Sequence, residues 1–291
     1  SSIPGVFLSV PFFTTLSHMC QGRALTNQLL EEFDIRPGNT TRVLWFTDKI
    51  TDLDSTSEMV KKLGWEAYRA GRAVKIITAL PDEEVPPSLP PNVLRLPYIY
   101  EFALPTGESE KLRVPSVLKS LQDIFAFEPD EIVISTPGPV GLLGMLAGRL
   151  LKVRTTGVYH AEYAELDEAP ADDDSLSPVL SSYAQWFYSM MDDIRVPARS
   201  CIERLGARGY DRRKMSLFPR GIDGDLFRPD NAARVKLAER YGIQPGVTLC
   251  YAGGVAQNRH LDFLFDVYTA LAAERDDLNL VIAGDGSARE M

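Results

Sequence analysis

The amino-acid sequence predicts an α/β protein built on parallel sheets that are covered by helices, with a second, smaller domain after the first. From residue 41 onward, short apolar runs alternate with segments that have helical spacing of apolar residues. The runs are apolar at consecutive positions, which is typical of strands buried on both faces. The chain has 291 residues, of which 45% are hydrophobic and 24% are charged, a balance typical of globular proteins.

Apolar runs predict the strands of the first sheet at residues 43–46, 74–78, 93–96, 132–134, 155–159 and 194–197. Helical spacing predicts helices over 55–70, 117–125 and 140–151, around 186–188, and after a cap at Ser200. Sheets of this kind place their ligand sites in the loops at the carboxyl ends of the strands. Here these loops are 47–56, 136–139 and 160–170.

The second domain is predicted from two strands, 247–252 and 278–283, that flank a helix at 261–271. A parallel sheet of two strands covers little core, so we expect this domain to be incomplete in the chain. The predicted organisation is a lead-in or tail of an upstream domain (1–40), an N-terminal domain (41–218), a connector (219–231) and a partial C-terminal domain (232–291).

Charge and cysteine usage exclude several classes of protein. The chain has 31 Lys and Arg against 40 Asp and Glu, a net charge of −9, which disfavours a general nucleic-acid binder. Three scattered cysteines are too few for a disulfide framework or a metal knuckle and fit a reducing compartment. We therefore expect a cytoplasmic protein, at the inner face of the membrane if it contacts one.

Two strand-end loops carry polar groups suited to a sugar or a nucleotide. Acidic residues (Asp48 and 52–54) follow the first strand, and they predict either contact with a sugar or ordinary turn and capping contacts. His160 ends the strand at 155–159, where a ligand contact and a structural role are both open. Nearby, Glu162 either binds a ligand or faces solvent.

A pair of glycines, Gly253 and Gly254, follows the strand at 247–252, where a phosphate could approach the backbone and a helix N-terminus. The pair lacks the G-x-G-x-x-G spacing of dinucleotide sites, and no such motif follows the first strand, which disfavours an NAD-dependent enzyme. Arg259, at the start of the next helix, either neutralises a diphosphate or is a solvated charge.

Two basic clusters predict solvated helix and turn surface, with contact to an anionic lipid surface as the alternative. Their members are Lys61, Lys62, Arg69 and Arg72 in one cluster, and Arg204, Arg208, Arg212, Arg213 and Lys214 in the other.

Short motifs recur along both domains in a characteristic order. In the second domain and the stretch before it they are 219–223, 227–229, 251–253, 261–264 and 280–286, and in the first domain 135–139, 157–160 and 196–200. In order and spacing they resemble the family 4 glycosyltransferases, enzymes of GT-B fold, and are most similar to the bacterial mannosyl- or glucosyltransferase type. The resemblance covers about residues 41–291.

The resemblance implies two Rossmann-like domains, the first for the acceptor and the second for a nucleotide-sugar. It also implies sugar transfer with retention of anomeric configuration and without a metal or other cofactor. By position, His160 would be the catalytic residue beside the transferred sugar. The donor diphosphate would be bound by Arg259, Gly253, Gly254 and Arg220, and the acceptor or sugar by a group made of Asp54, Ser55 and Glu162.

The sequence departs from the family pattern in three places. Gly254 stands where the family has an arginine, and Asp54 and Ser55 stand where it has an Asn-Gly or Gly-Gly pair. A Cβ at Ser55 narrows the approach to the backbone that a glycine allows. The Glu-containing donor motif would lie beyond Met291. We therefore expect this chain to be truncated in its C-terminal domain and inactive by itself.

Together these features predict a glycosyltransferase that moves a mannose- or glucose-type hexose from a nucleoside-diphosphate sugar to a hydroxyl on a lipid, glycan or small molecule. Lipid or polysaccharide glycosylation is the expected context. The expected partners are the donor and the acceptor, with peripheral membrane contact and no nucleic acid. The alternative is a non-catalytic GT-B module that binds a sugar or nucleotide or serves as a scaffold, which Gly254 and Ser55 favour.

Overall fold

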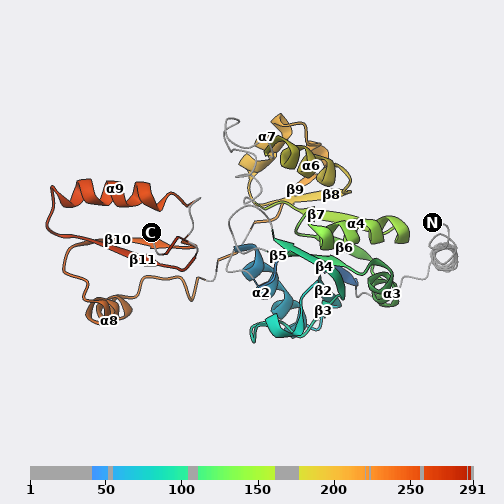
Figure 1. Ribbon diagram of the computed structural model, residues 1–291, viewed down its shortest axis with the longest axis horizontal. Helices are drawn as coiled ribbons and strands as arrows, with labels where there is room; N and C mark the ends of the chain where they lie inside the picture. The colour runs from blue at the N-terminus through green and yellow to red at the C-terminus, as the bar shows by residue number, and fades with distance from the viewer. Residues whose placement is uncertain are drawn as a thin grey trace. The chain divides into compact units, whose positions relative to one another are not determined.

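The computed structural model describes residues 41–51, 55–103, 111–160, 177–219, 221–222, 224–255, 259–286 and 288–289. The chain forms two compact units, unit 1 and unit 2, that divide between residues 220 and 221. This division lies within the segment 219–231 that the sequence predicts as a connector (Figure 1). The predicted lead-in, 1–40, lies outside the described residues.

Unit 1 is built on a seven-stranded sheet with the strand order β3-β2-β1-β6-β7-β8-β9. Neighbouring strands pair in parallel throughout. The strands are β1 (Val43–Phe46), β2 (Val74–Thr78), β3 (Val93–Arg95), β6 (Glu131–Ile134), β7 (Arg154–Val158), β8 (Asp193–Val196) and β9 (Met215–Leu217). Because the order runs outward from β1 in one direction and from β6 in the other, the topological switch point lies between β1 and β6.

Helices connect these strands and cover both faces of the sheet. They are α2 (Ser55–Arg69), α3 (Val117–Phe127), α4 (Pro139–Leu151), α6 (Ser177–Ser189) and α7 (Arg199–Ala207), with short 3₁₀ turns η1 (Asp82–Glu84) and η2 (Arg212–Lys214). Phe46 of β1 belongs to the same core cluster as Leu143 of α4. Trp45, the preceding residue of β1, packs on the other cluster, which contains Val60 of α2. Alternate residues of one strand therefore serve two core layers, as the continuous apolar runs predict.

The predicted elements differ from the structure mainly at their ends. The strands predicted at 155–159 and 194–197 lie one residue earlier, as β7 and β8. Ser200 lies inside α7 and does not cap it, because the cap residue is Ala198, which has no side-chain hydrogen-bonding group. Such shifts of one residue are typical of helix and strand boundaries.

A small sheet of β4 (Tyr98–Ala103) and β5 (Lys111–Pro115) was not predicted from the sequence. It is anchored by Arg113, whose buried guanidinium makes ion pairs with Glu84 at 2.6 Å and with Glu101 at 2.7 Å. These two partners come from a proline-rich loop and from the neighbouring strand, so local patterning alone gave no sign of this charge cluster around Arg113.

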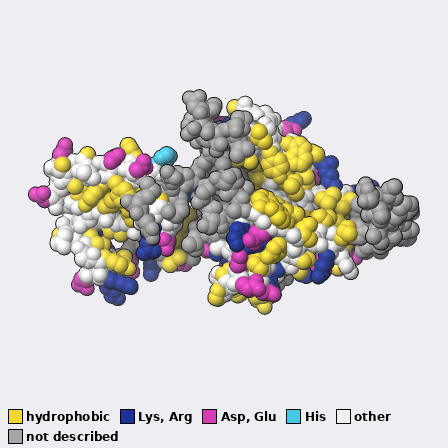
Figure 2. All heavy atoms as spheres, in the orientation of Figure 1, with side chains coloured by type: hydrophobic (Ala, Val, Ile, Leu, Met, Phe, Trp, Pro, Cys, Tyr) yellow, Lys and Arg dark blue, Asp and Glu magenta, His cyan; other side chains and the backbone are white. Residues whose placement is uncertain are grey.

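Unit 2 consists of α8 (Asn231–Tyr241), β10 (Val247–Ala252), α9 (Leu261–Ala272) and β11 (Leu278–Ala283), with β10 and β11 paired in parallel. Among its described residues, Val255 and Leu261 are the only apolar side chains that are buried. Phe263 of α9 is 67% exposed and Val235 of α8 is 56% exposed. Apolar side chains are accordingly visible at the surface of this unit (Figure 2). A two-stranded sheet has little surface on which to bury them.

The close packing of α4 on β1 generates a prediction about stability. A Cβ added at Gly144 of α4 would lie 2.7 Å from the Phe46 ring, so Gly144→Ala forces a shift in the core. We expect it to lower the free energy of unfolding by about 1–3 kcal/mol, despite the better helix propensity of alanine. Urea unfolding measures the change.

The control is Gly221→Ala, because a Cβ at the exposed Gly221 meets nothing within 4 Å. It should leave stability unchanged, and a Gly144→Ala protein as stable as wild type would contradict the packing described.

Candidate functional site

The carboxyl ends of β1 and β6 meet at the switch point, and Asp48 lies in the loop just beyond β1. Its carboxylate accepts a hydrogen bond from the Thr136 hydroxyl at 2.6 Å and from the backbone N–H of Val140 at 2.8 Å. A longer bond of 3.4 Å comes from the N–H of Gly141. In return, the Asp48 N–H donates to the Thr136 hydroxyl at 2.7 Å. One side chain thus joins two strand-end loops and the first turn of α4.

In this arrangement Asp48 makes a capping contact, one of the two roles that the sequence left open, and residues 52–54 lie outside the described residues. The carboxylate is a capping group, but for α4, which is distant in the sequence, and not for the helix that follows its own strand. The cap residue of α4 is Gly138, which has no side chain to offer, and Pro139 follows it. A helix that starts Gly-Pro leaves its first N–H groups to be satisfied from elsewhere, and this is the sequence signal that could have identified Asp48.

Burial raises the pKa of Asp48 to about 6, although its hydrogen bonds from Thr136, Val140, Gly141 and Gly138 lower it. Tyr183 of α6 lies near the same group and donates its hydroxyl to the Pro137 carbonyl at 2.6 Å. Burial, with a smaller contribution from the charge of Asp48, raises the pKa of Tyr183 to about 12. Tyr183 therefore remains a donor at neutral pH and ties α6 to the loop after β6.

His160 directly follows Tyr159 at the carboxyl end of β7 and is fully buried. Tyr159 packs on Tyr188 and Tyr210, with ring centroids 5.4 Å and 6.5 Å apart. The Tyr188 hydroxyl donates to the Val158 carbonyl at 3.2 Å. The strand end that carries His160 is therefore held by an aromatic cluster of α6 and the turn after α7.

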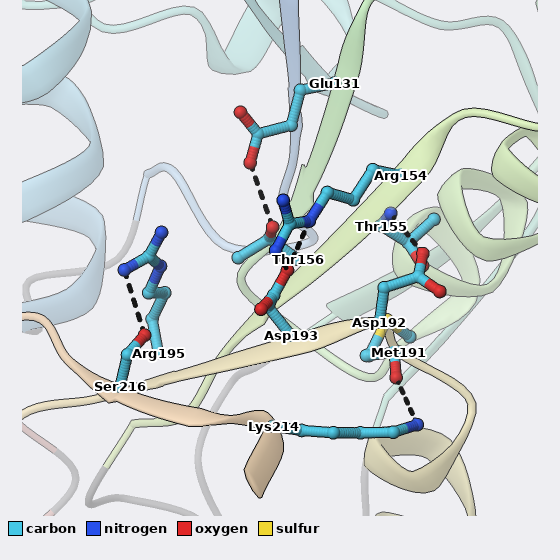
Figure 3. A network of polar contacts seen from close by, with 10 residues as sticks. All are labelled: Glu131, Arg154, Thr155, Thr156, Met191, Asp192, Asp193, Arg195, Lys214 and Ser216. Atoms are coloured by element: carbon cyan, nitrogen blue, oxygen red, sulfur yellow. Dashed lines mark hydrogen bonds and ion pairs between the residues drawn. The ribbon is translucent and has the colours of Figure 1, made fainter.

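The amino ends of the same strands carry a different kind of polar network (Figure 3). Glu131 of β6 accepts a hydrogen bond from Thr156, and Arg154 of β7 pairs with Asp193 of β8. Asp192 accepts from the Thr155 N–H at 2.8 Å. Polar groups at this edge bond to one another across neighbouring strands, and Arg154–Asp193 is an ion pair among them, so they help to hold the sheet together.

The predicted donor-side residues of unit 2 follow β10 and precede α9. A Cβ added at Gly254 would meet nothing within 4 Å, so the backbone is open there. The Tyr251 hydroxyl donates to the Gly254 carbonyl at 2.7 Å and fixes the course of this loop. Arg259 lies immediately before His260, the cap residue of α9. The glycine pair and Arg259 thus lie at the carboxyl end of a strand and at the start of the next helix.

The remaining predicted site residues are distributed as follows. Ser55 is the first residue of α2 and is exposed. Asp54, Glu162 and Arg220 lie outside the described residues, so their predicted roles stay predictions. Among the described residues, no group of three or more His, Cys, Asp or Glu side chains is placed to hold a metal ion. The helices that are described include none with the length and apolarity needed to cross a bilayer.

Parts of both basic clusters are engaged within the protein. Lys214 donates to the Ser189 carbonyl at 3.0 Å and to the Met191 carbonyl at 2.7 Å, so it closes the C-terminal turn of α6. Arg213 pairs with Asp211 at 2.9 Å, and Arg69 pairs with Glu66 at 3.4 Å. These contacts favour the interpretation as helix and turn surface.

Comparison with known proteins places the chain in a family. The sequence model of Glycosyltransferase Family 4 matches residues 57–226, more than half of the chain, and the chain belongs to this family. The alpha-monoglucosyldiacylglycerol synthase of Streptococcus pneumoniae is 24% identical over 251 residues, which are 84% of this chain and 56% of that protein. The GDP-mannose-dependent alpha-mannosyltransferase of Mycolicibacterium smegmatis is 30% identical over 169 residues, 56% of this chain and 41% of that protein. The chain spans about half the length of these relatives.

Solved structures agree on the fold. Anabaena Alr3699/HepE in complex with UDP and glucose superposes with a TM-score of 0.60 at 14% identity, over 85% of this chain and 62% of that one. Sucrose-phosphate synthase from Thermosynechococcus elongatus superposes with a TM-score of 0.52 at 15% identity, over 84% of this chain and 71% of that one. The predicted α/β architecture of GT-B type is confirmed.

The raised pKa of Asp48 predicts a specific pH dependence of stability. Its value of about 6 in the folded protein exceeds the ordinary value of 3.8, so the native state binds the proton more tightly between these two pH values. The free energy of unfolding therefore falls as the pH rises through this window, by about 3 kcal/mol from this group. Asp48→Asn removes that contribution.

Urea unfolding of both proteins at several pH values from 4 to 7 tests this, since all other groups titrate alike in the two. The wild-type stability should fall relative to that of Asp48→Asn as the pH rises. A constant difference between the two proteins across this range would show that Asp48 titrates normally.

Proposed function

We propose that the protein carrying this chain is a retaining glycosyltransferase that moves a mannose- or glucose-type hexose from a nucleoside-diphosphate sugar to a hydroxyl acceptor. The observation that carries the proposal is the family match over residues 57–226. The names of the relatives from S. pneumoniae and M. smegmatis describe glucosyl and mannosyl chemistry. A structural relative was solved with UDP and glucose bound, which supports a nucleotide-sugar donor.

In this proposal the two units divide the substrates. Unit 2 takes the donor, because the open backbone at Gly254, the Arg259 side chain and the start of α9 follow the carboxyl end of β10, and such groups favour an anion. Unit 1 takes the acceptor at the carboxyl ends of its strands, where His160 would contact the transferred sugar. Transfer requires stabilisation of the departing diphosphate, which positive side chains and backbone N–H groups can supply without a metal ion.

The acceptor class is proposed on the same basis. The S. pneumoniae relative is named for a diacylglycerol glycolipid, so a lipid or polysaccharide hydroxyl is the acceptor we favour. A lipid acceptor would bring the protein to a membrane surface as a peripheral partner, at the cytoplasmic face.

The experiment that tests the function is nucleoside-diphosphate release by the whole protein against a panel of GDP-, UDP- and ADP-sugars, with lipid and glycan acceptors present. Release from one donor supports the enzyme and identifies that donor. A folded protein that releases no diphosphate from any donor would favour the non-catalytic module.

Replacing the predicted catalytic residue gives a second test. His160→Ala should lower the rate of sugar transfer by about 100-fold, as expected for loss of a group that acts on the reacting sugar. Thermal unfolding and donor affinity serve as controls. His160 is buried, so a loss of activity could also come from unfolding of the variant. Unchanged turnover in a folded variant would exclude His160 from catalysis.

Gly254 distinguishes an enzyme from the alternative, a binding or scaffold module. The open surroundings of Gly254 accept a long side chain, so Gly254→Arg should fold normally. A guanidinium at this place should tighten nucleoside-diphosphate binding about tenfold through charge-assisted hydrogen bonds.

Binding is measured by calorimetry with UDP and GDP, and Gly224→Arg is the matched control, because Gly224 is equally open and lies outside the loop. An equal gain in nucleotide affinity from both variants would show that the added positive charge acts wherever it is placed. Transfer activity that appears only with Gly254→Arg would indicate a decayed enzyme.

A further inference from the structure

At the switch point of unit 1, a charged group of the chain itself accepts the hydrogen bonds of the strand-end loops and of α4. In an open parallel sheet the crevice lies outside the carboxyl ends of the strands at the switch point, here between β1 and β6. The Ser135 N–H donates to the Phe46 carbonyl at 2.9 Å, so these two strands remain paired to their ends. Asp48 follows β1 and Thr136 follows β6, and their side chains meet at this point.

The Asp48 carboxylate takes the donors that a bound phosphate would use. Val140 and Gly141 provide the first free N–H groups of α4, because Pro139 has none, and both donate to Asp48. Such N–H groups and the helix dipole favour any anion at this place, whether it belongs to a ligand or to the protein. Here the anion belongs to the protein.

The loop before α4 packs closely against the carboxylate. A Cβ added at Gly138 would lie 2.5 Å from the carboxyl carbon of Asp48, so the backbone wraps the group tightly. Thr136 contacts it from the end of β6. A second anion that approached the same N–H groups would meet both the occupied donors and a like charge at short range, which is unfavourable.

We propose that Asp48 is a specificity-determining residue that bars phosphate-bearing groups from the crevice of unit 1, so that the part of the acceptor that enters it is uncharged. The conclusion about the acceptor rests on the proposed function, which assigns the acceptor to unit 1. The exclusion itself is a property of the folded chain and is measured without any sugar transfer.

Two further observations support the proposal. Burial raises the pKa of Asp48 only to about 6, so the group is an anion at pH 7.5. Unit 2 shows the opposite arrangement at its corresponding strand end, because Gly254 follows β10 and a Cβ there would meet nothing within 4 Å. The chain therefore presents one strand end closed by a carboxylate and one that is open.

The test is the binding of inorganic phosphate to the full chain at pH 7.5, with chloride at matched ionic strength as the reference. Backbone amide shifts of Val140 and Gly141 report on the crevice, and thermal unfolding reports on overall binding. Wild type should show no saturable phosphate-dependent shift at these amides. Asp48→Ala should show one, and saturating phosphate should raise its midpoint of unfolding by about 3 °C.

Asp48→Ser provides a second variant, because its short hydroxyl keeps one acceptor near α4 and leaves room for an anion. Asp230→Ala is the matched control, since Asp230 also caps a helix, accepting from the N–H groups of Ala232 and Ala233, but on an exposed surface. It should not gain phosphate binding.

Several results would overturn the proposal. Saturable phosphate shifts at Val140 and Gly141 in wild type would show that the crevice is open, whether or not the variants fold. A folded Asp48→Ala or Asp48→Ser protein without any phosphate response would show that the crevice is not an anion site. If Asp230→Ala gained as much phosphate binding as Asp48→Ala, the binding would be a property of any helix that has lost its cap. None of these results depends on sugar transfer, so the proposed function is tested separately.

Discussion

The carboxyl edge of unit 1 depends on one interaction, the contact of the Asp48 carboxylate with the first turn of α4. It joins the loops that follow β1 and β6, the two neighbouring strands at the switch point of the sheet. Tyr183 of α6 also bonds to this region, because its hydroxyl donates to the Pro137 carbonyl in the loop after β6. The raised pKa of Asp48 means that its ionised form costs stability at neutral pH, and strained or costly charges of this kind are concentrated at functional sites.

The two units differ in how their strand ends are built. In unit 1, the loops after β1 and β6 are joined by the hydrogen bond between the Thr136 hydroxyl and the Asp48 carboxylate. The end of β7 is held by the aromatic cluster around Tyr159. In unit 2, β10 is followed by Gly254, whose backbone has open space around it, and Arg259 lies just before α9. This difference supports a division of labour in which the diphosphate of a donor binds to unit 2 and an acceptor binds to unit 1.

Much of the fold was predictable because its signals are local. The runs at 43–46 and 74–78 are strands with the predicted bounds, and the apolar segment at 140–151 is α4 from Pro139 onward. The cap of α4 by Asp48 was not predicted, because the two lie far apart in the sequence and meet only through the parallel pairing of β1 and β6. The sheet of β4 and β5 was not predicted either, although its strands are consecutive, and the ion pair of Arg113 with Glu84 joins it to the proline-rich loop.

We propose that a nucleoside diphosphate binds at the open strand end of unit 2, while the crevice of unit 1 is closed by its own carboxylate. Backbone amide shifts of the whole protein, titrated with UDP and with GDP, test it most directly. We expect saturable shifts at Gly253, Gly254 and the first turn of α9, and none at Val140 and Gly141. Saturable shifts at Val140 and Gly141, with unit 2 unperturbed, would contradict it.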